Sequence, residues 1–464
     1  MKNWKNVDNK NFAVAQKLMP AFPYITKLII TAAFKTAEQE VATATKVLLD
    51  FKKSLLQLLV LLNRIMSSEL RFLRDFHRQI FLCFPKLFEA LTKIYQYSEL
   101  GEILRNLFEC ILSREKESSS MHCIKLQCLH AIICGRSKYI RHSEFRSRVL
   151  PCIVVTLRKH IISRDELEQT WSIMICKELV KVIHESKDTN DAWSISYVLP
   201  SMLTLLKTML GSEKHAIRYQ PSAHLKHIKP LKTMNIVGLT AASMLQIVEM
   251  MSKGQMKHFL TACLSSDPEI PSSEVDIYNF IKDLLGVCIH LISLEDKIFP
   301  ELWAAVCILL HKNTLGVLTW FSSPLKSKFL FKDEDMTLRN NEYETDATFS
   351  VARRGSKFGR RRGISNAVTY LSRDTSVSDE MKFKLWFMFL SLGLDMLNSN
   401  TLDFEHSSQL RREYIVEQIG DMRDDVCDVI QSVWNALGKL KLSMIESLVE
   451  PLLRLADLPH EKTR

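Results

Sequence analysis

Apolar residues recur at the spacing of an α-helix along almost the whole chain, and this period limits the folds that are open to it. Between residues 276 and 292 the apolar side chains share one helical face and the polar ones take the other. The apolar residues are Ile277, Phe280, Ile281, Leu284, Leu285, Cys288 and Leu291. Pro271, Ser272 and Ser273, just before them, are typical of a helix start. We therefore predict a helix with one buried face here.

Similar apolar stripes follow one another as far as residue 456. One of them spans 163–183, where Ser163 and Glu166 have the spacing of a capping box. The others lie at 46–66, 71–97, 100–113, 120–135, 144–161, 192–210, 233–252, 301–321, 380–398, 408–437 and 441–456. Together they predict roughly fourteen helices joined by short polar segments.

Turn-forming residues are scarce, which argues against an all-β fold. The 464 residues include only 13 glycines and 13 prolines, less than half of the roughly 12% that average composition gives. A β-sandwich or barrel needs a turn about every 8 to 12 residues. The chain is also longer than the roughly 250 to 300 residues that one hydrophobic core supports. We predict an all-α fold, an α-solenoid of degenerate armadillo- or HEAT-like helical pairs, with a compact multi-helix bundle as the alternative.

Changes in composition suggest how the chain is divided. We expect a weakly ordered N-terminal extension over 1–35, a helical array over 36–331, and C-terminal helices of the same array over 378–464, ending abruptly. Between the last two, residues 332–377 begin acidic and become basic, and we predict a disordered, charged insertion. Residues 214–248 contain no acidic residue, and the first half of that segment is predicted to be a basic loop.

The basic half of the insertion is a candidate binding patch. Six cations fall within ten residues, namely Arg353, Arg354, Lys357, Arg360, Arg361 and Arg362. Ser356 lies in a context typical of basophilic kinase sites, and its phosphorylation would offset part of this charge. We expect either an anionic membrane surface or an acidic protein partner here. The alternative is a solvated loop whose basic half pairs with its own acidic half.

No pattern in the sequence predicts a catalytic residue, a metal site or a cofactor. Phosphate-binding glycine loops and hydrolase motifs are missing. Cys123, His130 and Cys134 share one helical face, but one rigid helix cannot surround an ion, so core packing is favoured. His224 and His227 lie in the basic loop without a Cys or carboxylate to complete a site, which favours a solvated loop.

Neither nucleic-acid binding nor membrane insertion is expected. The basic residues are not interleaved with aromatic ones, as nucleic-acid binding would require. No apolar run approaches the roughly 20 residues of a membrane span. Lysines interrupt the first 35 residues, so no signal peptide is predicted. The 11 cysteines stand mostly in apolar surroundings, as reduced thiols do, and we expect a cytoplasmic protein.

Several short groups of residues in the C-terminal part occur in a characteristic order. They are Leu385-Trp386-Phe387, Leu410 to Tyr414, Gly420-Asp421-Met422-Arg423, Ile430 to Trp434, Gly438 and Pro451-Leu452-Leu453. This order resembles the dedicator of cytokinesis (DOCK) family, and among its members those acting on Rac. The similar part is the helical region between the family's lipid-binding and catalytic regions. Phe299 to Trp303 and Val149 to Pro151 extend the likeness, which runs over roughly 40–464.

The resemblance implies a role in guanine nucleotide exchange on Rho-type GTPases, with an ELMO-type adaptor and a Rho or Rac GTPase as partners of the full-length family. The family's exchange region would lie beyond Arg464, and its lipid-binding region before residue 1. We therefore expect a non-catalytic scaffold segment that is peripheral at the plasma membrane. The alternatives are an independent armadillo- or HEAT-like adaptor that binds protein partners, and an enzyme with an unrecognised site.

Overall fold

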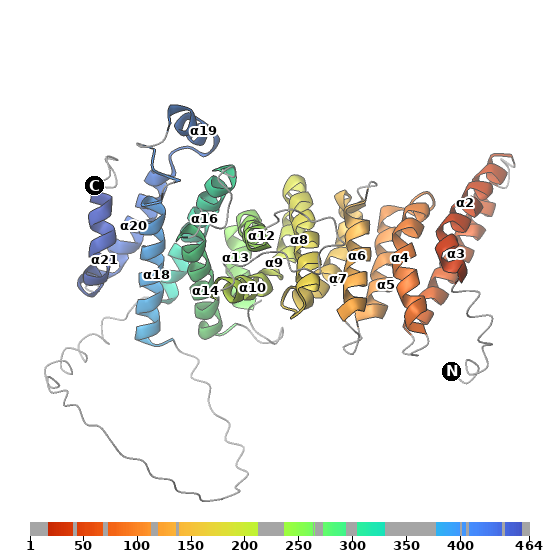
Figure 1. Ribbon diagram of the computed structural model, residues 1–464, viewed down its shortest axis with the longest axis horizontal. Coiled ribbons are helices and arrows are strands. Elements are labelled where there is room, and N and C mark those ends of the chain that lie inside the picture. The colour runs from red at the N-terminus through yellow and green to blue at the C-terminus, as the bar shows by residue number, and fades with distance from the viewer. Residues whose placement is uncertain are drawn as a thin grey trace, which may run out of the picture. The chain divides into compact units, whose positions relative to one another are not determined.

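The computed structural model (Figure 1) contains only α-helices and short 3-10 helices among the residues that it describes. The described residues are 17–39, 44–67, 73–112, 119–135, 139–211, 236–262, 264, 272–293, 304–329, 377–399, 401–404, 408–438 and 441–456. The elements are η2 (Met19–Ala21), α2 (Phe22–Gln39), α3 (Ala44–Met66), α4 (Arg74–Leu91), α5 (Tyr97–Leu112), α6 (Ser119–Ile133), η4 (Tyr139–Arg141), α7 (Ser143–Ile161), α8 (Glu166–Ser186), α9 (Thr189–Ser196), α10 (Leu199–Gly211), α12 (Ile236–Met250), α13 (Lys253–Ala262), α14 (Glu274–Ser293), α16 (Ala304–Lys328), α18 (Asp379–Leu397), α19 (Gln409–Ile419), α20 (Met422–Ala436) and α21 (Lys441–Ala456). The predicted all-α fold is confirmed.

The chain divides into two compact units. The first comprises Met1–Met256 and Leu294–Asn313, and the second comprises Lys257–Ser293 and Thr314–Arg464.

From α2 to α7 each helix packs against the helix two places further along, as in an α-solenoid, and α8 packs against α12. One row runs through α2, α4, α6, α8 and α12, and the other runs through α3, α5, α7 and α10. Figure 1 shows α2 to α8 side by side in chain order. Each pair thus covers the apolar stripe of the pair before it, so a long chain folds without one large core. The predicted solenoid is confirmed.

Aromatic side chains fill the centre of this unit. Phe88 of α4 lies with its ring centroid 5.3 Å from that of Tyr139 and 6.0 Å from that of Phe145. All three side chains are buried. Each fully buried phenylalanine contributes about 1.5 to 3 kcal/mol relative to an exposed one, so the cluster ties α4, η4 and α7 together.

A glycine sets the distance between α5 and α7. A Cβ added at Gly101 would lie 2.8 Å from the Cβ of Arg148 and 3.1 Å from the carbonyl oxygen of Phe145. Contacts this short force neighbouring atoms to move. The two helices therefore approach closely because position 101 has no side chain.

In the second unit, α18 packs against α14, α20 and α21. Trp386 of α18 is fully buried, and its indole Nε1–H donates a 2.9 Å hydrogen bond to the carbonyl oxygen of Phe329. Gly393 faces Ile430 so closely that an added Cβ would lie 2.7 Å from its Cδ1 atom. Phe259 of α13 packs edge to face on Phe280 of α14, with centroids 5.4 Å apart.

Most predicted stripes coincide with helices, but two of them are split. The stripe at 192–210 becomes α9 and α10, and the stripe at 408–437 becomes α19 and α20. The second break lies at Gly420, whose φ of 74° is left-handed and ends α19. Asp421 then accepts a hydrogen bond from the backbone N–H of Arg423 and caps α20.

Two expectations need correction, and one helix was not predicted. Residues 22–35, which we expected to be weakly ordered, belong to α2, because Pro23, Thr26 and Ile30 form a buried stripe. The short helix α13 was not predicted. The cap of α8 is Asp165 rather than Ser163, because the Asp165 carboxylate accepts from the backbone N–H groups of Leu167 and Glu168.

Candidate functional site

The predicted basic patch and phosphorylation site lie outside the described residues. This holds for Arg353, Arg354, Ser356, Lys357, Arg360, Arg361 and Arg362, and also for His224 and His227.

The cysteines and histidine of α6 do not form a site together. Cys123 is buried in the core, and the ring of His130 packs on Trp171 with centroids 5.2 Å apart. Cys134 lies just beyond the end of α6 and is exposed. The expected core packing therefore holds for Cys123 but not for Cys134.

A different group of side chains meets between α6, α7 and α8. Nδ1 of His122 lies 3.2 Å from Oε1 of Glu168, and Nδ1 of His160 lies 2.8 Å from Oε2 of the same carboxylate. The two imidazole rings pack edge to face, with centroids 4.9 Å apart. His122, His160 and Glu168 are called the His–Glu cluster below. Both oxygens of one buried carboxylate thus face an imidazole.

Local structure places Glu168 at the centre of this cluster. Asp165 caps α8, and its Oδ2 also accepts a hydrogen bond from Ser119 at the start of α6. Glu168 lies in the first turn of α8, and its carboxylate contacts His122 of α6 and His160 of α7. The Ser172 hydroxyl donates a 2.7 Å hydrogen bond to the backbone carbonyl of Glu168.

The cluster holds a charged carboxylate beside a neutral imidazole. Burial alone would raise the pKa of Glu168, but hydrogen bonds from His160, Ser163 and Ser119 outweigh it, and the pKa lies below its ordinary value. Burial lowers the pKa of His160, more than the carboxylate of Glu168 raises it. At neutral pH, Glu168 is therefore ionised and His160 is neutral.

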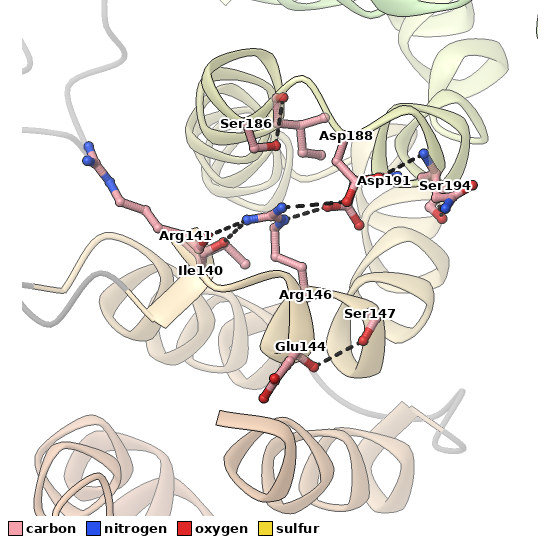
Figure 2. Close-up of polar contacts among 11 residues, drawn as sticks. Ile140, Arg141, Glu144, Arg146, Ser147, Ser186, Asp188, Asp191 and Ser194 are labelled. Atoms are coloured by element: carbon pink, nitrogen blue, oxygen red, sulfur yellow. Dashed lines mark hydrogen bonds and ion pairs between the residues drawn. The ribbon is translucent and has the colours of Figure 1, made fainter. Parts of the chain in front are cut away.

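A second polar cluster is built around the buried side chain of Arg146 on α7 (Figure 2). Its Nε donates to Oδ2 of Asp191 at 2.5 Å, and its Nη1 donates to the carbonyl oxygens of Ile140 and Arg141 at 3.1 and 2.7 Å. Nη2 lies 4.0 Å from Oδ2 of Asp188. Figure 2 shows the guanidinium between these carboxylates and the two carbonyls. The Arg146 cluster therefore joins η4, α7 and α9.

The junction between α8 and α9 positions the two aspartates. Lys187 ends α8 in the left-handed region, with φ at 54°, and Asp188 caps α9 by accepting from the backbone N–H groups of Asn190 and Asp191. Burial raises the pKa of Asp191, and the positive charge of Arg146 limits the rise. Arg146, Asp188 and Asp191 bind one another and the backbone around them, so we interpret the cluster as a structural link between helices.

The buried thiols are poor nucleophiles. Burial raises the pKa of Cys123 to about 11 and the pKa values of Cys176 and Cys288 to about 12. Because the thiolate is the reactive form, these cysteines are unreactive at neutral pH.

The first two long helices expose apolar side chains in stripes. On α2, Ile25, Leu28 and Ile29 are exposed on the side opposite the buried Thr26 and Ile30, and Leu28 is 70% exposed. On α3, the exposed residues Leu49, Leu56 and Val60 recur at helical spacing. Single exposed leucines are ordinary, but a stripe is typical of a protein-binding surface.

Sequence reasoning missed the His–Glu cluster because its members are far apart in the chain. Glu168 is 46 residues from His122, and only the packing of three successive helices brings them together. No local motif marks such a site. Ligands that lie close together in sequence on one helix, such as those of α6, cannot converge on an ion.

Known proteins are similar to this one along nearly the whole chain. The family model of the dedicator of cytokinesis (DOCK) TPR region matches residues 5–353 and 362–464. The chain belongs to the DOCK family. It is 21% identical over 459 residues to Dedicator of cytokinesis protein 3 of Homo sapiens, covering 97% of this chain and 19% of that protein. It is 20% identical over 386 residues to Dedicator of cytokinesis protein 4 of Mus musculus, covering 82% and 16% respectively.

The chain thus spans about a fifth of the length of these DOCK relatives. Residues that carry the family likeness have structural roles where they are described. Trp386 is a buried packing residue, and Gly420 and Asp421 form the junction between α19 and α20. Among the described helices, none combines the length and apolar character that a membrane span requires.

Proposed function

We propose that this chain is a non-catalytic helical scaffold segment of a DOCK-family guanine nucleotide exchange factor for Rho or Rac GTPases. The observation that carries the proposal is the family match, which extends along nearly the whole chain and concerns the region described as the TPR region. Stacked helical pairs suit such a role, because they present long surfaces to other proteins.

The partners follow from the family and from the exposed stripes. In the parent protein, an ELMO-type adaptor and a Rho or Rac GTPase are the partners, and the output is regulation of the cytoskeleton. The exposed apolar stripes of α2 and α3 offer a surface for protein contacts. We place the chain in the cytoplasm, with access to the plasma membrane.

Membrane contact is assigned to Arg353, Arg354, Lys357, Arg360, Arg361 and Arg362. Each basic residue near an anionic surface contributes about 1 kcal/mol. Liposomes that contain anionic lipid are expected to bind the chain more tightly than a variant with these six residues changed to Gln. A phosphomimetic Ser356→Glu variant should bind with intermediate strength. Equal binding of all three proteins would exclude the lipid role.

Nucleotide release tests the non-catalytic assignment. Rac loaded with fluorescent GDP is mixed with a large excess of unlabelled nucleotide, with and without the chain. Release should stay at the intrinsic rate, while chelation of magnesium by EDTA gives the fast control. Acceleration by the chain alone would show that it contains exchange activity.

A further inference from the structure

Three side chains from three successive helices bring metal-ligating atoms together in the His–Glu cluster. The ligand atoms of His122, His160 and Glu168 all lie within 4.8 Å of one another. Two imidazole nitrogens and one carboxylate are a donor set that zinc uses with a fourth position open to water. This residue combination therefore already has the composition of a metal site.

The spacing of the ligand atoms is close to what a tetrahedral ion requires. With bonds of about 2.0 to 2.2 Å, two ligand atoms on zinc lie about 3.3 Å apart. Nδ1 of His122 is 3.2 Å from Oε1 of Glu168, and Nδ1 of His160 is 2.8 Å from Oε2 of the same carboxylate. The ligand atoms all lie within 4.8 Å of one another, so side-chain rotations that shorten the widest separation by up to about 1.5 Å would let them bind one ion.

Charge and access also favour a cation. Asp165, which Ser119 holds at the edge of the cluster, adds a second negative charge that a divalent ion would offset. The side chains of Glu168 and His160 are 5% and 8% exposed, and that of His122 is 15% exposed. His122 thus marks the side from which an ion and a water molecule enter.

Residues around the ligands keep the carboxylate in place. The Ser172 hydroxyl donates to the backbone carbonyl of Glu168, and Asp165, which accepts from Ser119, also accepts from the backbone N–H of Glu168. Such outer partners orient ligands in metal sites.

We propose that His122, His160 and Glu168 form a site for a divalent transition metal of the zinc class, with water as the fourth ligand. The ion would link α6, α7 and α8 and stabilise the middle of the first unit. This inference is independent of the proposed scaffold function, since it concerns the folding of the chain rather than its partners.

The test measures zinc bound to the tag-free chain by isothermal titration and by native mass spectrometry. One ion per chain is expected, together with a rise in melting temperature when zinc is in excess over its Kd. His122→Gln removes the most exposed of the three ligands while retaining a hydrogen-bonding side chain. Its zinc affinity should fall at least about 100-fold, with an unchanged circular dichroism spectrum.

Two matched variants identify the site. His184→Gln changes an exposed histidine of α8, and a His224→Gln/His227→Gln variant removes the other histidine pair. Both should bind zinc as the unchanged chain does. The proposal is overturned if the second variant loses the ion, or if His122→Gln binds zinc as tightly as the unchanged chain.

Cobalt gives a readout that needs no variant. Co²⁺ in this tetrahedral site should show visible absorption bands without the near-ultraviolet charge-transfer band of a thiolate ligand. A thiolate band would overturn the assignment of water as the fourth ligand, because it would show that a cysteine sulfur binds the ion. Absence of tetrahedral bands would overturn the site itself.

Discussion

At the scale of single residues, Arg146 shows how a charged side chain is tolerated in the interior of a helical array. It is fully buried, and its guanidinium donates to one carboxylate and two backbone carbonyls. Burying a charge is costly unless it is paired and hydrogen-bonded. Arg146 meets both conditions, so its removal leaves Asp191 as an uncompensated buried charge.

Arg146→Ala is therefore expected to lower the free energy of unfolding by about 3 to 5 kcal/mol. Urea titration of the variant, followed by circular dichroism, measures this loss. Arg148→Ala on the same helix is the matched control, because Arg148 is exposed, and it should change stability by less than about 0.5 kcal/mol. Similar losses in the two variants would contradict the role of Arg146 as a structural link between helices.

His311 makes the first unit sensitive to acid. It is completely buried, and Nδ1 of its ring lies 2.8 Å from the carbonyl oxygen of Cys307. Burial lowers its pKa from 6.5 to about 4. His311 is therefore harder to protonate in the folded chain than in the unfolded chain. Its contribution to the free energy of unfolding is full above pH 6.5 and falls as the pH drops toward 4.

Between about pH 7.5 and about pH 5, this one group should cost about 2 kcal/mol of folding free energy. A His311→Gln variant should lose less stability over that interval than the unchanged chain does. The comparison uses urea midpoints at the two pH values, with exposed His290→Gln as the control. An identical pH dependence in His311→Gln would show that His311 is not the responsible group.

At the scale of helices, close approach is set by small residues. Gly101 lets α5 pack against α7, and an added Cβ would meet Arg148 and Phe145. Gly316 of α16 is different, because a Cβ there would meet no atom within 4 Å. The two glycines therefore predict opposite effects of the same substitution.

Gly101→Ala is expected to destabilise the chain by about 1 to 3 kcal/mol through overpacking. Gly316→Ala should stabilise it by up to about 1 kcal/mol, because alanine favours the helix and fits the space. Thermal unfolding of both variants checks the pair. Stabilisation by Gly101→Ala would mean that α5 and α7 are further apart than described.

Helices were predictable from sequence wherever one apolar stripe was continuous. The stripe at 276–292 became α14, and Ser273 caps it as predicted, since its hydroxyl accepts from the backbone N–H of Asp276. The ends of helices within a stripe were harder to predict. Gly420 and Asp421 separate α19 from α20, but the apolar period continues on both sides of them. Helix α2 was not predicted, because apolar side chains lie on its exposed face as well as on its buried face, and the helical period is therefore not apparent from the sequence.

At the scale of the whole molecule, the solenoid and the family were both predictable, but the polar clusters were not. Periodicity and scarce turn residues imply stacked helices, and the order of packing residues carries the family likeness. The His–Glu cluster and the Arg146 cluster depend on which helices become neighbours. Asp191 and Arg146 are 45 residues apart, and no local pattern encodes that distance.

We propose that this chain supports exchange on a GTPase without catalysing it. An exchange factor must bind Rac to release GDP. The observed rate of GDP release therefore rises in proportion to the concentration of the exchange factor. The decisive measurement is the slope of that rate against the concentration of the chain, with Rac held constant. We predict a slope of zero, and a positive slope that vanishes when the chain is denatured would contradict the claim.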